Sequence, residues 1–169
     1  WEELNKLTRS AGALTAFIDP DDRSFYNPSN MENAIRDFCR KTGQTVPSNR
    51  GAFLRVVYES LALKYRRIKE QIYSVCGSDS KVVHIVGGGS KNILLNQFVA
   101  DALGLPVIAG PEEATAVGNL MVQAMGLGVI RSMKEALPII KQAFPLKEYK
   151  PRDTASWDTA YGRFCKIVK

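Results

Sequence analysis

A short β-branched segment that ends at three consecutive glycines limits what this chain can fold into. Residues 82–86 (VVHIV) are apolar and rich in valine, which is typical of a strand buried on both faces. The glycines at 87–89 end this strand, and beyond Ser90, which can serve as a helix N-cap, apolar residues recur at helical spacing as far as Gly104. A second short buried strand follows at 106–109. Strands alternating with helices predict an α/β fold with a parallel sheet.

The rest of the chain is expected to be largely helical. Apolar spacing and capping signals predict helices over about 1–12, 30–40, 48–76, 112–127, 132–143 and 153–168. The helix at 48–76 is the strongest, since one apolar stripe runs along it for about six turns and is expected to be buried. That stripe consists of Leu54, Val57, Leu61, Tyr65, Ile68, Ile72 and Val75. In the helix at 30–40 the expected buried stripe consists of Met31, Ile35 and Phe38.

Composition narrows the functional classes. With 169 residues, of which 45% are hydrophobic and 24% charged, the chain suits a single globular domain. It contains no apolar run of about 18 residues, so neither a membrane span nor a membrane partner is expected. The three cysteines, Cys39, Cys76 and Cys165, are odd in number and far apart, which favours a reduced, cytoplasmic protein. Because His84 is the only histidine, a histidine-based metal cluster or catalytic triad is not expected.

The basic balance of the chain, a net charge of +6, raises the question of an anionic partner. Its densest basic stretch, KYRRIK at 64–69, lies within the helix predicted at 48–76. We interpret this stretch as the solvated face of an amphipathic helix, because no nucleic-acid-binding motif accompanies it. Nucleic acid is therefore not expected as a partner.

The glycine turn after the first strand is the strongest candidate for a ligand site. Gly87, Gly88 and Gly89 carry no Cβ, so a ligand can approach their backbone closely. The following helix directs unpaired N–H groups and partial positive charge at the same space, which suits a phosphate. Asn92 can offer both a donor and an acceptor to a ribose or a base. The glycines can equally serve a tight bend alone, and the segment matches neither the P-loop nor the GxGxxG pattern.

The turn after the second strand carries two adjacent carboxylates. Pro111 is expected in the first turn of the helix at 112–127, where Glu112 and Glu113 would complement the positive end of the helix dipole. Neighbouring residues on a helix point about 100° apart, so the two glutamates do not converge on one proton. They are therefore not expected to act as an acid–base pair.

Four segments of the chain resemble one protein family. The longest, HIVGGGSKNILLNQFVADALGLPVIAGPEEATAVGNLMVQAMGLG at 84–128, is similar over its whole length to the C-terminal domain of FGGY carbohydrate kinases. FIDPDDRSFYNP (17–28), ESLALKYR (59–66) and FPLKEYKP (144–151) strengthen the resemblance and follow the family's order. Within the family, the similarity is greatest to the kinases that act on L-rhamnulose.

This resemblance implies a fold and a division of the chain. The implied fold is the C-terminal part of an actin-like (ribonuclease H-like) ATPase domain, an α/β structure with an incomplete sheet and several packed helices. Residues 1–47 would form insertion-like helices and a loop, 48–128 the nucleotide-binding α/β core, and 129–169 the C-terminal helices.

The resemblance also implies an ATP site. In the family, the glycine turn contacts the nucleotide phosphates and an asparagine contacts the nucleoside. The resemblance places Gly88 and Asn92 at these two positions, with Gly87 and Gly89 completing the turn. The small-residue helix around 114–118 would help to wall the adenine side.

The implied reaction is the transfer of the ATP γ-phosphoryl group to a ketose, with L-rhamnulose expected and fuculose or xylulose as alternatives. The catalytic aspartate, the Mg²⁺ ligands and the sugar contacts would lie in an N-terminal half that precedes Trp1. No catalytic or metal-binding residue is therefore assigned here, and the chain alone is expected to be inactive and to bind ATP weakly. A non-catalytic actin-like nucleotide-binding module is the alternative from another class.

The same resemblance places three further strands before Trp1, the first of them beside strand 82–86. Strand 82–86 would then present an unpaired apolar edge, and such edges recruit other chains. We expect this edge to be covered by a segment not recognised in the sequence, by another chain, or by a longer protein. The segment FCKIV at 164–168 is one candidate to supply a strand, although it otherwise fits a helix.

Overall fold

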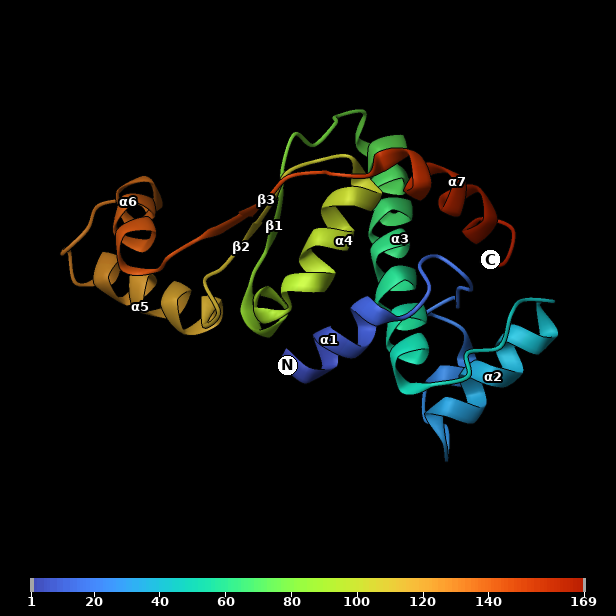
Figure 1. The fold of residues 1–169 in the computed structure, drawn as a ribbon. Helices are drawn as coiled ribbons and strands as arrows, with labels where there is room; N and C mark the ends of the chain where they lie inside the picture. Colours follow the sequence, from blue (N-terminus) through green and yellow to red (C-terminus); the bar gives the residue numbers. More distant parts are fainter. Residues whose placement is uncertain (1, 169) are drawn as a thin grey trace.

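The computed structural model describes residues 2–168, and its elements follow the expected order (Figure 1). The helices are α1 (Glu2–Ser10), α2 (Met31–Lys41), α3 (Arg50–Cys76), α4 (Ile93–Leu103), α5 (Ala114–Gly126), α6 (Met133–Ala143) and α7 (Thr154–Phe164). The strands are β1 (Val83–Ile85), β2 (Val107–Ala109) and β3 (Lys147–Tyr149), and two 3₁₀ helices are η1 (Arg23–Phe25) and η2 (Gly87–Lys91). All the expected helices and both expected strands are present, with ends shifted by a few residues.

The sheet has the order β1-β2-β3. β1 and β2 are parallel, with Ile85 opposite Ala109, which confirms the predicted α/β arrangement. β3 is not predicted by the sequence pattern, and it pairs antiparallel with the other side of β2, placing Lys147 opposite Ala109 and Tyr149 opposite Val107. The outer edge of β1 has no partner strand among residues 2–168. The suggestion that 164–168 supplies a strand is wrong, because α7 continues to Phe164 and a turn follows it.

The main hydrophobic core lies between the sheet, α3, α4 and α7 (Figure 1). α4 is apolar nearly all round, because it packs on α3, on α7 and on strands β2 and β3. Phe98 of α4 and Trp157 of α7 lie with their ring centroids 5.4 Å apart. A second, smaller cluster joins α2 to the first half of α3 through Ile35, Phe38 and Phe53. Together these contacts hold α4, and with it the turn that precedes it, on a fixed scaffold.

None of the seven residues of the predicted stripe on α3 is fully buried, and only Leu54, Val57 and Leu61 in its first half are partly buried. All eight buried residues of α3 lie between Gly51 and Leu63. Farther along, Ile68 is 44% exposed and Ile72 is 53% exposed, so the expectation of a continuously buried stripe is wrong. The packing partners of α3, chiefly α4 and α1, do not cover its last turns. Met31, expected in the buried stripe of α2, is also exposed.

A buried ion pair fastens the N-terminal segment to α3. The carboxylate of Glu59, which is fully buried, accepts a hydrogen bond from Arg55 Nε and another from the Leu14 amide at 2.8 Å. Arg163 of α7 donates to the carbonyl oxygens of Leu14 and Thr15, each at 2.9 Å. Burial raises the pKa of Glu59, although these hydrogen bonds and the charges of Arg55 and Arg163 oppose the shift.

The basic stretch at 64–69 is not simply a solvated face, as its sequence pattern suggests. Lys64 Nζ lies 2.6 Å from an Asp21 carboxylate oxygen and 3.2 Å from one of Asp19. Arg66 pairs with Asp158 of α7 and with Glu70. These side chains therefore hold separate elements together by contacts to the chain's own carboxylates.

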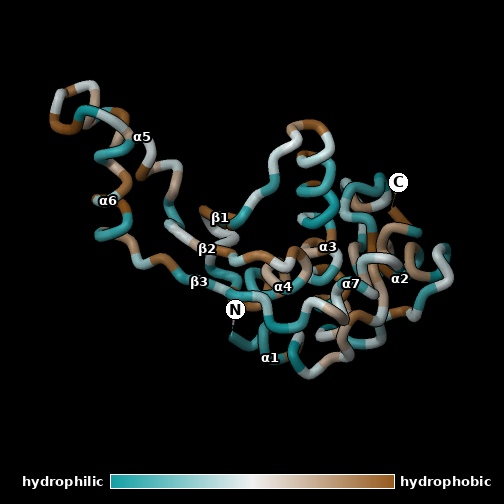
Figure 2. The backbone as a smooth tube through the Cα atoms, turned by 90° about the horizontal axis from the view of Figure 1, so that it is seen from above, coloured by the Kyte–Doolittle hydropathy of each residue, from teal (hydrophilic) through white to brown (hydrophobic). Residues whose placement is uncertain are grey.

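Helices α5 and α6 form an arm that projects from the rest of the molecule in both views (Figures 1 and 2). They pack chiefly on each other. Much of the apolar surface of these helices and of the segment between them is exposed: Leu120, Val122, Leu127, Val129, Met133, Leu137 and Ile139. No helix in the described part of the chain is both long enough and apolar enough to cross a bilayer.

Candidate functional site

The glycine turn lies at the carboxyl end of β1, as the sequence predicts, but it is longer than expected. Residues Gly87–Lys91 form the 3₁₀ helix η2, and α4 begins only at Ile93. The expectation that Ser90 caps α4 is wrong, since its hydroxyl instead donates to the Gly87 carbonyl oxygen at 2.7 Å. The N-cap is Asn92, whose Oδ1 accepts a hydrogen bond from the Leu95 amide at 3.1 Å.

The three glycines of the turn have different structural roles. Gly87 adopts a φ of +74°, in the left-handed region that side chains disfavour. A Cβ at Gly89 would make an ordinary contact with Ile85 Cγ2 at 3.6 Å. A Cβ at Gly88 would meet no atom within 4 Å, and Gly88 has no positive φ. The fold therefore has no conformational need for glycine at 88, and the space beside it is open to an approaching ligand.

Asn92 is placed where the sequence predicts but is less available than expected. Its side chain is part of the first turn of α4, and the residue is only 4% exposed. Because its oxygen is engaged as the helix cap, the amide nitrogen is the part of this side chain that remains to donate to a ligand. The fully buried Asn96, one turn later, donates to the Ser90 carbonyl oxygen at 2.9 Å and so fixes the end of η2 on α4.

The second turn, after β2, is tied to the first. The Gly110 amide donates to the Ile85 carbonyl oxygen at 2.9 Å. Gly110 has a φ of +111°, and a Cβ there would lie 3.3 Å from Leu146 Cδ2. The expectation that Pro111 opens a helix is wrong, because α5 begins only at Ala114, after a turn.

The two glutamates of this turn do not act as a pair on the helix dipole. Glu112 lies before α5, and its carboxylate is 2.8 Å from Lys91 Nζ of the glycine turn. Glu113 is at the N-cap of α5 without a capping side-chain hydrogen bond. Contact with Glu112 raises the pKa of Lys91. The ion pair thus links the two turns across the ends of β1 and β2.

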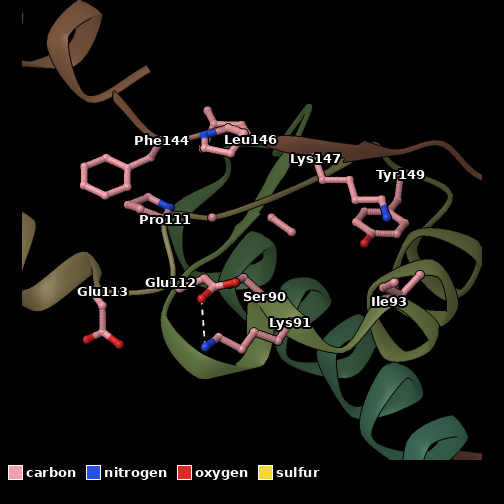
Figure 3. Close-up of a pocket in the computed structure, with 13 residues that line it drawn as sticks. Ser90, Lys91, Ile93, Pro111, Glu112, Glu113, Phe144, Leu146, Lys147 and Tyr149 are labelled. Carbon is pink, nitrogen blue, oxygen red and sulfur yellow. Dashed lines mark ion pairs between the residues drawn. The ribbon is translucent and has the colours of Figure 1, made fainter. Parts of the chain in front are cut away.

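A cavity of about 670 Å³ opens between the two turns and β3 (Figure 3). Its apolar wall includes Ile93, Ala109, Pro111, Phe144 and Leu146. Its polar lining includes Ser90, Lys91, Glu112, Lys147 and Tyr149. The predicted residues Gly87, Gly88, Gly89 and Asn92 do not line the cavity; they flank it through their neighbours in the same turn. Sequence reasoning misses Lys147 and Tyr149, because β3 carries no strand signal and is distant in the chain.

The described residues offer no ready-made metal centre. Among residues 2–168, no group of three or more histidine, cysteine, aspartate or glutamate side chains lies close enough to hold a metal ion. The three cysteines are free, Cys39 in the core and Cys76 and Cys165 on the surface. The groups that the two turns after β1 and β2 offer to a ligand are backbone N–H groups, the N-terminus of α4 and an adjoining apolar cavity. Together these groups suit a phosphorylated ligand.

Solved structures with this fold are sugar kinases. The structure of xylulose kinase from Rhodospirillum rubrum matches 98% of this chain with a TM-score of 0.56, at 18% identity and over 37% of that protein. Gluconate kinase from Lactobacillus acidophilus matches 88% of this chain with a TM-score of 0.56, at 13% identity and over 36% of that protein. The chain accordingly has the fold that these two kinases show over the matched residues.

The family follows from sequence comparison. The model of the FGGY family of carbohydrate kinases, C-terminal domain, matches residues 1–127, and the chain belongs to this family. Rhamnulokinase from Bacteroides thetaiotaomicron is 46% identical over the whole of this chain, and rhamnulokinase from Pectobacterium carotovorum is 39% identical over 96% of it. The chain spans only 35% and 34% of the lengths of these two relatives.

Proposed function

We propose that this chain is the ATP-binding part of a cytoplasmic sugar kinase that transfers the ATP γ-phosphoryl group to L-rhamnulose. The relatives at 46% and 39% identity are both rhamnulokinases, which supports this ketose over fuculose and xylulose. The observation that carries the proposal is the turn itself: three glycines between β1 and α4, with open space beside Gly88 at the carboxyl end of a parallel strand.

In this proposal the backbone of the glycine turn receives the phosphates. The N–H groups of η2 and the partial positive charge at the start of α4 stabilise the anionic phosphates. Gly88 permits close approach, while Asn92 donates its amide to the nucleoside. These groups bind and orient ATP, and orientation with charge stabilisation accounts for most of the catalysis of phosphoryl transfer.

The remaining machinery is assigned to the rest of the protein. Mg²⁺ would neutralise charge on the phosphates, and we place its ligands, the catalytic base and the sugar contacts in the N-terminal half, because this chain spans about a third of its relatives. Closure of that half onto this domain would exclude water, so that the sugar receives the phosphoryl group.

A coupled assay of ADP release tests this function. The full-length protein is expected to release ADP when ATP and L-rhamnulose are both present, and far more slowly with L-fuculose or D-xylulose. Chain 1–169 alone is expected to release none and to bind ATP weakly, since it lacks several charge-assisted phosphate contacts worth about 1.5–3 kcal/mol each. Rhamnulose-dependent ADP release by the chain alone would contradict the placement of the catalytic residues outside it. A full-length protein that prefers another ketose would contradict the assignment of L-rhamnulose as the substrate.

A further inference from the structure

Asn96 is a polar side chain inside the apolar helix α4, where it costs the fold stability. It is fully buried, and its helix neighbours Leu94 and Phe98 belong to the main hydrophobic core. Its side-chain oxygen has no hydrogen-bond partner among the described residues. A buried polar atom without a partner destabilises a folded protein, and asparagine is also a poorer helix former than leucine. The amide nitrogen of the same side chain therefore has to account for asparagine at this position.

That nitrogen holds the glycine turn on the body of α4. Asn96 Nδ2 donates to the Ser90 carbonyl oxygen at 2.9 Å. Because a carbonyl oxygen can only accept, the nitrogen has to face Ser90, and the oxygen of the carboxamide is the atom left unpaired. Leucine has a similarly branched side chain and would suit the apolar surroundings, but it offers Ser90 no donor. Asparagine thus stabilises the turn at a cost to the core.

The hydrogen bonds within the turn span only a few residues. Ser90 Oγ donates to the Gly87 carbonyl oxygen at 2.7 Å, and the Asn92 amide donates to the Gly89 carbonyl oxygen at 3.1 Å. Glycines allow many backbone conformations, and the hydrogen bonds of 3₁₀ helices have poorer geometry than those of α-helices. The bond from Asn96 therefore ties a permissive backbone to a helix that α3, α7 and the sheet hold in place.

We propose that Asn96 is a positioning residue for the phosphates of the nucleotide. Through the Ser90 carbonyl it fixes the backbone of η2, so that the N–H groups beside Gly88 keep the arrangement that receives the phosphates. Donors fixed before the anion arrives need no ordering on binding, which strengthens affinity. Asn96 acts through Ser90 rather than by contact with the ligand, because it is fully buried. The proposal rests on the proposed function, in which this turn receives the phosphates.

Two substitutions in the full-length protein test the proposal. Asn96→Leu keeps the branched shape and removes both the donor and the unpaired oxygen, and Asn96→Ala removes them without crowding the core. Affinity for tripolyphosphate, measured by its competition with ATP, is expected to fall about fivefold to tenfold in both, the upper figure corresponding to about 1.4 kcal/mol. The KM for ATP is expected to rise by the same factor, and the KM for the ketose to stay unchanged. In Asn96→Leu without ligand, hydrogen exchange should be faster at residues 87–91 and unchanged at 98–103.

Ser60→Ala is the matched control, because Ser60 is another fully buried polar side chain. Its hydroxyl donates to the Val56 carbonyl oxygen at 2.6 Å and accepts from the Ile18 amide at 2.9 Å, so its partners lie in α3 and the N-terminal segment. This variant should lower the melting temperature and leave tripolyphosphate affinity unchanged. A purely structural role for Asn96 would give that same result in its own variants.

The proposal is overturned if either Asn96 variant, folded as its melting transition shows, binds tripolyphosphate as tightly as the parent protein. It is also overturned if Ser60→Ala weakens tripolyphosphate equally. If Gly88→Val weakens tripolyphosphate while the Asn96 variants do not, the proposed function stands and this inference fails. If the full-length protein binds neither ATP nor tripolyphosphate, the proposed function fails and this inference fails with it.

Discussion

The Gly87 amide donates a hydrogen bond to the Pro111 carbonyl oxygen at 3.0 Å, so the turns that follow β1 and β2 form one connected edge. The hydrogen bond from Gly110 to Ile85 and the ion pair between Lys91 and Glu112 join the same two turns. A change in either turn is therefore expected to disturb the backbone of both. This connection makes the second turn a sensitive place to test the site without touching the glycines themselves.

The first prediction concerns Gly110→Ala. The φ of +111° and the contact that a Cβ would make with Leu146 at 3.3 Å both oppose a side chain at this position. We expect the free energy of unfolding of the full-length protein to fall by about 1–3 kcal/mol and the KM for ATP to rise. Gly162→Ala in α7 is the control, because its Cβ meets nothing within 4 Å, and it should raise stability by roughly 0.5–1 kcal/mol. Equal melting temperatures for Gly110→Ala and the parent protein would refute the prediction.

The second prediction separates the two roles of Asn92. Serine is as good an N-cap as asparagine but has no amide group, so Asn92→Ser should change stability by less than about 0.5 kcal/mol while weakening ATP binding. Asn92→Ala should weaken ATP binding similarly and also cost about 1 kcal/mol of stability through the lost cap at Leu95. Chemical denaturation and calorimetric titration of the full-length variants measure the two effects. If Asn92→Ser binds ATP normally, Asn92 serves only as the helix cap.

The third prediction concerns the buried pair of Arg55 and Glu59. Arg55→Leu leaves the Glu59 carboxylate buried without its ion pair, which should cost about 3–5 kcal/mol. Burial already raises the pKa of Glu59, so the folded state holds the proton more tightly than the unfolded state does. Stability contributed by this group is therefore present below the ordinary carboxyl pKa and is lost as pH rises through the raised value.

Removal of Arg55 raises the pKa of Glu59 further, so the loss in Arg55→Leu should be larger at about pH 8 than at about pH 5. Urea denaturation at the two pH values measures this difference. Arg40→Leu breaks an exposed ion pair with Asp37 and should cost no more than about 1 kcal/mol at either pH. A loss in Arg55→Leu that is the same at both pH values would count against a buried, ionised Glu59.

The fourth prediction concerns the open edge of β1. Chain 1–169 presents this edge, and exposed Ile68 and Ile72 of α3 line a hollow together with Val83 of β1, so the chain alone is expected to self-associate. Replacing both isoleucines by lysine should shift the chain toward the monomer, as light scattering would show. A stable monomer of the unmodified chain, with β1 fully protected from hydrogen exchange, would be the contrary result.

Local patterns in the sequence predict the elements that form the site. The β-branched run before three glycines, followed by helical spacing, specifies β1, the turn and α4 without knowledge of distant contacts. The position of the cap is less local, because Ser90 and Asn92 are both good N-caps and only the formation of η2 selects Asn92. Likewise, apolar periodicity predicts the helix α3 but not which of its residues the neighbouring elements cover, since none of the seven predicted stripe residues is among the buried ones.

Local sequence patterns do not predict the cavity between the two turns and β3. β3 has only three residues, two of them charged, and it is a strand because β2 offers it an edge. Without β3, Tyr149 has no predicted place near the glycine turn, and nothing in the sequence around it indicates a ligand. Tertiary pairing thus supplies the part of the site that local patterns omit.

The most direct test of the account is the KM for ATP of the full-length Gly88→Val variant. The fold leaves open space at Gly88 and does not need glycine there, so valine should be accommodated while it occupies the space that the phosphates approach. The matched control is Gly162→Val, a helix position whose Cβ also meets nothing within 4 Å. The KM for ATP is expected to be at least about tenfold higher in Gly88→Val, equivalent to about 1.4 kcal/mol, with an unchanged KM for the ketose and normal kinetics in the control. Unchanged ATP kinetics in a folded Gly88→Val variant would contradict it.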